Sequence, residues 1–170
     1  MKKTVLTFGL MSGAVSAAMM FATVPFADRI GFDKGEILGY TTIVLSFLLV
    51  FFGVRSYREN VGGGTVTFGR AFAVGILITL ISCVCYVAAW EIVYFTLMPD
   101  FTEKYASYAV ARVKASGGSQ QTIDATVLQM KEFKKLLDNP FSNAAITFVE
   151  PLPIGLVVTA ISAIALRKRR

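Results

Sequence analysis

Two carboxylates inside otherwise uncharged, apolar stretches are the residues of this chain best suited to chemistry. Glu91 is the only charged residue in 71–98, and Glu150 is the only one in 140–166. A charged side chain within a membrane is costly, so such residues commonly bind ions or carry protons. Counted from the expected outer ends of their helices, the two glutamates lie at similar depths. They therefore predict an ion or proton site.

Each carboxylate also has a purely structural interpretation. Glu91 stands among aromatic residues, Trp90 and Tyr94 included, of the kind that gather at a membrane interface. At that level Glu91 could pair with a lysine of the segment that follows. Glu150 directly precedes Pro151 and could simply cap a helix that starts there.

Other reactive groups are scarce. Histidine is absent, which removes imidazole relays, haem ligation, the common zinc sites and Ser/His or Cys/His dyads. Cys83 and Cys85 are two residues apart, so on a helix they point to nearly opposite faces and cannot bridge each other. Gly64 and Gly69 have phosphate-loop spacing, but Arg70 follows where a lysine is required. We expect no enzyme activity, no cofactor and no metal.

The elements that must position the glutamates are long apolar runs, at residues 4–26, 37–54, 71–98 and 140–166. About 20 apolar residues suffice for a helix to cross a hydrocarbon core of roughly 30 Å. Hydrophobic residues make up 55% of the chain and charged residues only 16%, and the mean hydropathy is +0.62. The sequence therefore predicts a single integral membrane domain over 1–170, an all-α, four-helix transmembrane bundle. The first run is too long for a cleaved signal peptide.

A more polar segment, 100–138, separates the third and fourth runs. Phe101 and Tyr105 belong to one apolar helical face, and Ile123 and Val127 belong to a second, with a Ser-Gly-Gly-Ser turn between them. We expect an amphipathic helical hairpin outside the membrane, packed on itself or lying on the outer leaflet.

The fourth run contains two helix-breaking prolines. Pro151 and Pro153 lack amide donors, and Pro151 disfavours helical geometry at the residue before it. Either the span is kinked there, or 141–149 is a separate interfacial piece and the span begins at Pro151. Few apolar residues remain before Arg167 in the second version, which favours the kink.

Small residues recur at helical spacing in the first and third runs. Such faces let two helices approach closely in a membrane, where lipid gives no hydrophobic drive for association. In the first run they predict packing within the chain or a seam between two copies, and in the third run they predict contact with another helix. The residues of this helix-packing face are Gly9, Gly13 and Ala17 in the first run and Gly75, Thr79 and Ser82 in the third.

The distribution of charge predicts the topology. With the N-terminus in the cytoplasm, nine basic residues and one acid, Glu59, fall inside, whereas bases and acids balance outside. Both termini are then cytoplasmic, and the bases face the anionic inner leaflet of the bilayer rather than nucleic acid. These bases are Lys2, Lys3, Arg55, Arg58, Arg70, Arg167, Lys168, Arg169 and Arg170.

Several stretches resemble one bacterial membrane family, known as domain of unknown function 4199. They are MKKTVLTFG at the start, FFGVRSYR at 51–58, GGGTVTFGRAF at 62–72, and the pairs Trp90-Glu91 and Glu150-Pro151. The resemblance implies four spans and a bacterial inner-membrane location, and it implies no activity. The glycine motif of the family points to four residues as candidates for a functional role. A role in loop shape or packing accounts for these positions equally well. These residues are Arg58, Gly64, Phe68 and Arg70.

Two functions follow as expectations. The first is a non-enzymatic membrane scaffold or accessory subunit that acts through helix packing, with a second copy or a membrane protein as partner. The second is an oligomeric small transporter or channel subunit in which Glu91 and Glu150 couple protons or cations.

Overall fold

The computed structural model describes residues 1–168; Arg169 and Arg170, which were included in the charge count, lie outside the described residues. Within the described part the fold is all-α, as predicted, and the one strand-like feature is an isolated bridge between Val66 and Lys168. The elements in order are α1 (Lys2–Thr23), a 3₁₀ turn η1 (Val24–Phe26), α2 (Ala27–Asn60), α3 (Phe68–Ile92), a π-helical turn η2 (Val93–Leu97), α4 (Phe101–Ala115), α5 (Gln120–Asp138), α6 (Pro140–Val149) and α7 (Leu152–Leu166).

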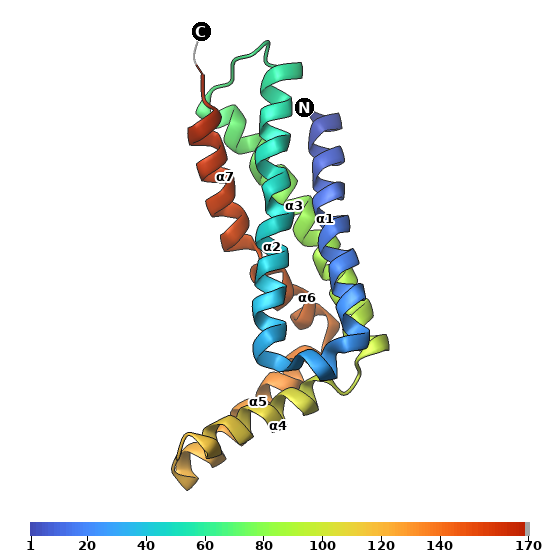
Figure 1. The fold of residues 1–170 in the computed structure, drawn as a ribbon, viewed down its shortest axis with the longest axis vertical. Helices are drawn as coiled ribbons and strands as arrows, with labels where there is room; N and C mark the ends of the chain where they lie inside the picture. Colours follow the sequence, from blue (N-terminus) through green and yellow to red (C-terminus); the bar gives the residue numbers. More distant parts are fainter. Residues whose placement is uncertain (169–170) are drawn as a thin grey trace.

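The long helices lie side by side as a bundle, and the hairpin of α4 and α5 projects from the end opposite the N-terminus (Figure 1). Three helical stretches are long and apolar enough to cross a membrane: Lys2–Asn60, Phe68–Leu97 and Pro140–Leu166. The first of these folds back on itself at η1, so it contributes both α1 and α2 (Figure 1).

The chain turns between α1 and α2 with little loss of helical structure. Residues 27–35 are helical apart from Gly31, whose φ of 72° and ψ of 168° interrupt the helix. Such a backbone conformation strains any residue with a Cβ. Asp28 and Asp33 in this turn bind residues of α4, far away in the sequence.

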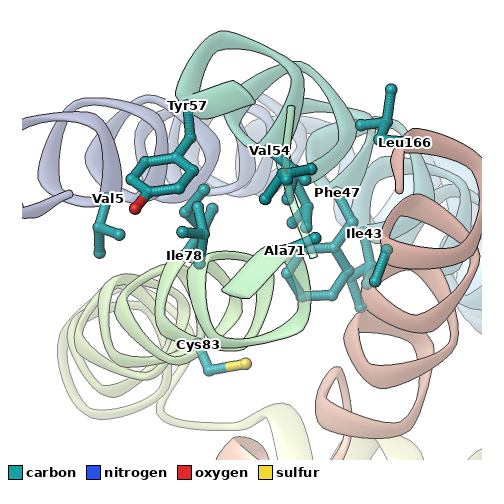
Figure 2. Close-up of a cluster of buried hydrophobic side chains, with 13 residues drawn as sticks. Val5, Ile43, Phe47, Val54, Tyr57, Ala71, Ile78, Cys83 and Leu166 are labelled. Carbon is teal, nitrogen blue, oxygen red and sulfur yellow. The ribbon is translucent and has the colours of Figure 1, made fainter. Parts of the chain in front are cut away.

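The core is a narrow column between α1, α2, α3 and α7. Figure 2 shows Phe47 of α2 and Ile78 of α3 between these helices, and Val5 of α1 and Leu166 of α7 belong to the same buried cluster. Phe47 and Ile78 are almost completely buried. α1 packs more extensively on α3 than on α2, its neighbour in the chain, and α7 packs on both α2 and α3.

The outer surface of the bundle is apolar as well. Leu45, Val84 and Ile161 are each more than half exposed, at 57%, 60% and 59%. Soluble monomers rarely carry large apolar patches, whereas helices that face lipid are apolar on the outside. Polar side chains such as Ser12, by contrast, are buried between helices.

The last apolar stretch is broken where the prolines predicted. α6 ends at Val149, and α7 begins at Leu152, with the Gly155 amide donating to the Pro151 carbonyl at 3.0 Å. α6 does not stand apart from the bundle, because it packs against α3 and buries Asn143 there. The kinked version of the fourth span fits this arrangement.

Candidate functional site

Glu150 lies at the break between α6 and α7. It is exposed on the protein surface, and the Tyr86 hydroxyl of α3 lies near its carboxylate. The charge of Glu36 in α2 acts on Glu150, and the charge of Glu150 acts on the phenol of Tyr40 in α2. Glu150 does not cap α7, whose first turn has no side-chain cap. The break therefore places the Glu150 carboxylate near two tyrosines and a second carboxylate, that of Glu36.

Glu91 occupies a different side of α3. It is half-buried, and its Oε1 is buried without a hydrogen-bond partner among the described residues. Glu91 and Tyr86 are five residues apart, which separates them by about 140° around the helix axis. Because Glu150 adjoins Tyr86, the two glutamates do not form a pair. Glu91 also forms no ion pair with a lysine of the hairpin, whose own ion pairs involve other acids.

The small residues of α1 lie directly against α3. A Cβ added to Gly13 would lie 2.4 Å from the Cβ of Cys85, and one added to Gly9 would lie 2.8 Å from the Cβ of Ile81. Contacts below 3.0 Å essentially never occur between real Cβ atoms. Glycine at both positions is therefore what lets α1 reach α3. Ala17, one turn further on, is half-buried.

The small face of α3 serves two partners. Gly75 and Thr79 meet α7, where the Thr79 hydroxyl lies 3.2 Å from that of Thr159. Ser82 faces the other way and is hydrogen-bonded to Ser12 of α1 at 2.9 Å. Ser12 in turn donates to the Ser46 carbonyl of α2. These faces are thus occupied by other helices of the same chain, and a seam between two copies stays a prediction.

A buried amide joins α3 to the last stretch of the chain. Asn143 of α6 is fully buried; it accepts from the Trp90 indole at 2.9 Å and donates to the Leu137 carbonyl at 2.9 Å. The Thr147 hydroxyl donates to the same side chain at 3.2 Å. Sequence reasoning missed this group. The signal was an amide four residues before a threonine in an apolar run, a spacing that places both on one helical face.

The hairpin is attached to the bundle by a second set of contacts, beginning with Tyr94 in η2, directly after α3. The Tyr94 hydroxyl lies 2.6 Å from that of Thr102 and donates to Asp138 at 3.0 Å, so it holds the start of α4 and the end of α5. Trp90 packs edge-on against Phe101, with ring centroids 5.1 Å apart. These aromatic residues fix where the hairpin leaves the bundle.

The turn between α1 and α2 holds the other side of the hairpin. Phe32 packs against a row of aromatic rings of α4, with centroids between 5.1 and 5.8 Å away. Lys104 pairs with Asp28 at 2.9 Å. Asp33 accepts from Tyr108 and lies 3.7 Å from Arg112. We refer to these contacts of α2 with α4 as the hairpin clamp.

The hairpin itself encloses a groove between α4 and α5. The groove has a volume of about 490 Å³, and its floor is formed by apolar side chains such as Val110, Val127 and Met130. Three lysines and one acid also line it. Lys134 is paired with Glu103 at 3.2 Å, whereas Lys114 and Lys131 form no ion pair with a described residue. The groove is therefore apolar inside and basic at its edge, as a binding surface for an acidic amphipathic partner would be.

Comparison with known proteins gives one match. The family model described as "Protein of unknown function (DUF4199)" matches residues 7–168, which is nearly the whole chain. The chain belongs to this family. Searches of curated proteins and of solved structures found no match. The resemblance seen in the sequence is thus confirmed.

In this DUF4199 member the match covers the bundle, the hairpin and the glycine loop together. The hairpin therefore lies inside the matched range. No cluster of three or more potential metal ligands occurs among the described residues of the DUF4199 chain. The features that remain for function are the groove of the hairpin, the two separate glutamates and the basic end of the bundle.

The hairpin clamp of this DUF4199 protein should weaken at alkaline pH. Hydrogen bonds to Asp28 and then to Asp100 raise the pKa of Lys104. A raised pKa in the folded state means that the stabilisation is complete below the ordinary lysine pKa of about 10.4 and is lost as the pH rises through the folded-state value. We expect the fluorescence of Trp90, beside the hairpin, to change over that range.

The comparison that isolates this effect is a Lys104→Gln variant, with Lys114→Gln as a matched control for the loss of one exposed lysine. The alkaline fluorescence change should be smaller in Lys104→Gln and unaltered in Lys114→Gln. Identical titration curves for all three proteins would contradict a contribution of Lys104 to the clamp.

Proposed function

We propose that this protein is a non-enzymatic scaffold or accessory subunit of the bacterial inner membrane that presents the α4–α5 hairpin to a partner. In this proposal α1, α2, α3 and the kinked α6–α7 stretch cross the membrane as a four-helix bundle, with both termini in the cytoplasm. The arrangement supports it, because the N-terminus, the α2–α3 loop and Lys168 gather at one end while the hairpin lies at the other (Figure 1).

The observation that carries the proposal is the contrast between occupied and free surfaces. The small residues of α1 pack against α3, and those of α3 pack against α7 and against α1, where Ser82 is hydrogen-bonded to Ser12. Helix packing at these residues therefore stabilises the fold of the chain itself. The groove of the hairpin is a surface that no other described part of the chain covers. The hairpin clamp holds this groove in a fixed orientation, which lowers the entropy cost of binding.

The chemistry of the groove indicates the kind of partner. An amphipathic helix that lays an apolar face into a groove is a common mode of recognition. Here Lys114 and Lys131, without acidic partners, would attract carboxylates at the edges of such a helix. We therefore propose an acidic amphipathic helix of a membrane partner protein as the occupant.

Site-specific photo-crosslinking tests this function. A photoreactive residue in place of Val127, which is 37% exposed on the wall of the groove, should give one crosslinked species in native membranes. Mass spectrometry should place the crosslink in an acidic amphipathic segment. Lys131→Glu should reduce the yield about tenfold or more, which corresponds to about 1.4 kcal/mol of binding energy.

The matched control is Lys135→Glu, on α5 but outside the groove, where Lys135 pairs with Glu132 at 2.7 Å. This variant should crosslink like the parent protein. Equal loss in both variants, a crosslink to a second copy of the chain, or no protein adduct at all would contradict the proposed partner.

The alternative, a transporter or channel subunit that uses Glu91 and Glu150, has less geometric support. The two carboxylates are on different sides of α3, so within one chain they are not placed to share a proton or a cation. The hairpin groove and a second cavity, beside Arg70 and Lys168, lie at the ends of the molecule, outside the bundle.

A further inference from the structure

A second cavity lies at the end of the bundle opposite the hairpin. It has a volume of about 620 Å³ and is formed where the α2–α3 loop, the first turn of α3 and Lys168 meet. Small-molecule sites have volumes of roughly 300–1,000 Å³. Among the described residues no acidic side chain lines this cavity, whereas Arg70 and Lys168 both do.

The glycine loop shapes one wall. Gly63 and Gly64 have φ angles of 60° and 84°, in the left-handed region that favours glycine. The loop is anchored to α2, because the Gly62 amide donates to the Tyr57 carbonyl and the Gly64 amide donates to the Arg58 carbonyl, both at 2.9 Å. The wall is therefore a fixed turn, built by the glycines of the motif noted in the sequence.

The opposite wall is held by the bridge between Val66 and Lys168. Their backbones exchange two hydrogen bonds of 3.1 and 3.0 Å, which fix Lys168 beside the loop. Neither Lys168 nor Arg70 forms an ion pair with a described residue, and Glu59, the acid at this end, is already paired with Arg55 and Arg58. The cavity thus has an uncompensated positive charge.

The first turn of α3 also contributes backbone amide hydrogen-bond donors beside the cavity. Thr67 caps the helix by accepting from the Arg70 amide at 3.4 Å, and the other amides of a first helical turn have no partner within the helix. The positive end of a helix of this length attracts anions, phosphate above all. Beside the cavity Phe68 and Val61 are about half exposed, at 44% and 53%, so apolar and basic surfaces adjoin there.

We infer that this cavity binds a phosphate group, and specifically the phosphate of an anionic phospholipid headgroup. Basic pockets between helices at the cytoplasmic surface suit such headgroups. Arg70 and Lys168 supply the charge, the start of α3 supplies backbone donors, and Phe68 and Val61 lie where the acyl chains would run. The inference rests on the membrane orientation proposed above and is independent of the hairpin groove.

The test uses the full-length protein in neutral detergent micelles, with melting followed by light scattering or fluorescence. Phosphatidylglycerol should raise the melting temperature, whereas phosphatidylcholine and inorganic phosphate at the same concentration should have little effect. In the double variant Arg70→Gln/Lys168→Gln, the apparent affinity for phosphatidylglycerol should fall at least tenfold. Its melting temperature without lipid should be unchanged, because both side chains are exposed.

The matched control is Lys2→Gln/Lys3→Gln, which removes the same charge from exposed residues at the same end but outside the cavity. It should bind phosphatidylglycerol like the parent protein. If both double variants lost the same affinity for phosphatidylglycerol, general surface charge would explain the binding, and the proposed site would be refuted. An equal effect of phosphatidylcholine would overturn the preference for anionic lipid, and an equal effect of inorganic phosphate would overturn the assignment to lipid. None of these outcomes bears on crosslinking at the hairpin.

Discussion

Replacing Gly13 with alanine should lower the free energy of unfolding by about 1–3 kcal/mol, the usual cost of overpacking a well-packed contact. The new methyl group would lie 2.4 Å from the Cβ and 2.8 Å from the Sγ of Cys85. The Cβ atom cannot rotate away, so α1 and α3 must separate. Thermal melting in detergent micelles, or unfolding of the protein with sodium dodecyl sulfate, measures the change.

The control for this prediction is Gly39→Ala in α2. Nothing lies within 4 Å of a Cβ added there, so the change should stabilise the helix by about 0.5–1 kcal/mol, as alanine normally does. A Cys85→Gly substitution should restore part of the stability lost in Gly13→Ala, because it removes the colliding atoms. If Gly13→Ala stabilised the protein as Gly39→Ala does, the close approach of α1 to α3 would be refuted.

Asn143→Ala should cost about 2–4 kcal/mol of stability, since each buried polar group left without a partner costs about 1–3 kcal/mol. The Trp90 indole and the Leu137 carbonyl would both lose their partner. Trp90 is the only tryptophan of the chain, so its fluorescence reports on this junction without ambiguity. We expect a shift of the emission maximum together with a lower melting temperature.

An exposed asparagine provides the comparison. Asn60 hydrogen-bonds only to Ser56 at the exposed end of α2, so Asn60→Ala should change stability by no more than about 0.5 kcal/mol and leave the emission unchanged. Equal behaviour of the two variants would mean that Asn143 does not hold α6 against α3.

The parts of the fold that could be predicted are those that depend on residues close together in the sequence. Apolar length predicted the helical runs, the serine-glycine turn predicted the hairpin, and Pro151 predicted the break that separates α6 from α7. The spacing of Gly9 and Gly13 predicted a packing face, but two different partners would have produced the same pattern. Only the structure shows that α3 of the same chain lies against it.

The arrangement of the glutamates was not predictable in the same way. Depth along a helix follows from counting residues, but rotation about the axis depends on which neighbour each helix packs against. Counting residues therefore placed Glu91 and Glu150 at a similar depth and suggested a shared site. In the structure the two side chains lie on different sides of α3. The role of Asn143 was hidden for a related reason, since its partners Trp90 and Leu137 come from two other helices.

The preference of α1 for α3 over α2 has a consequence for biogenesis. While the ribosome is still making α2, the serine and the two glycines of α1 have none of their α3 partners available. α1 can dock fully only after α3 has been made, so until then α1 is held by its contacts with α2. A nascent chain stalled before Ser82 emerges would consequently hold α1 more loosely than one stalled after it.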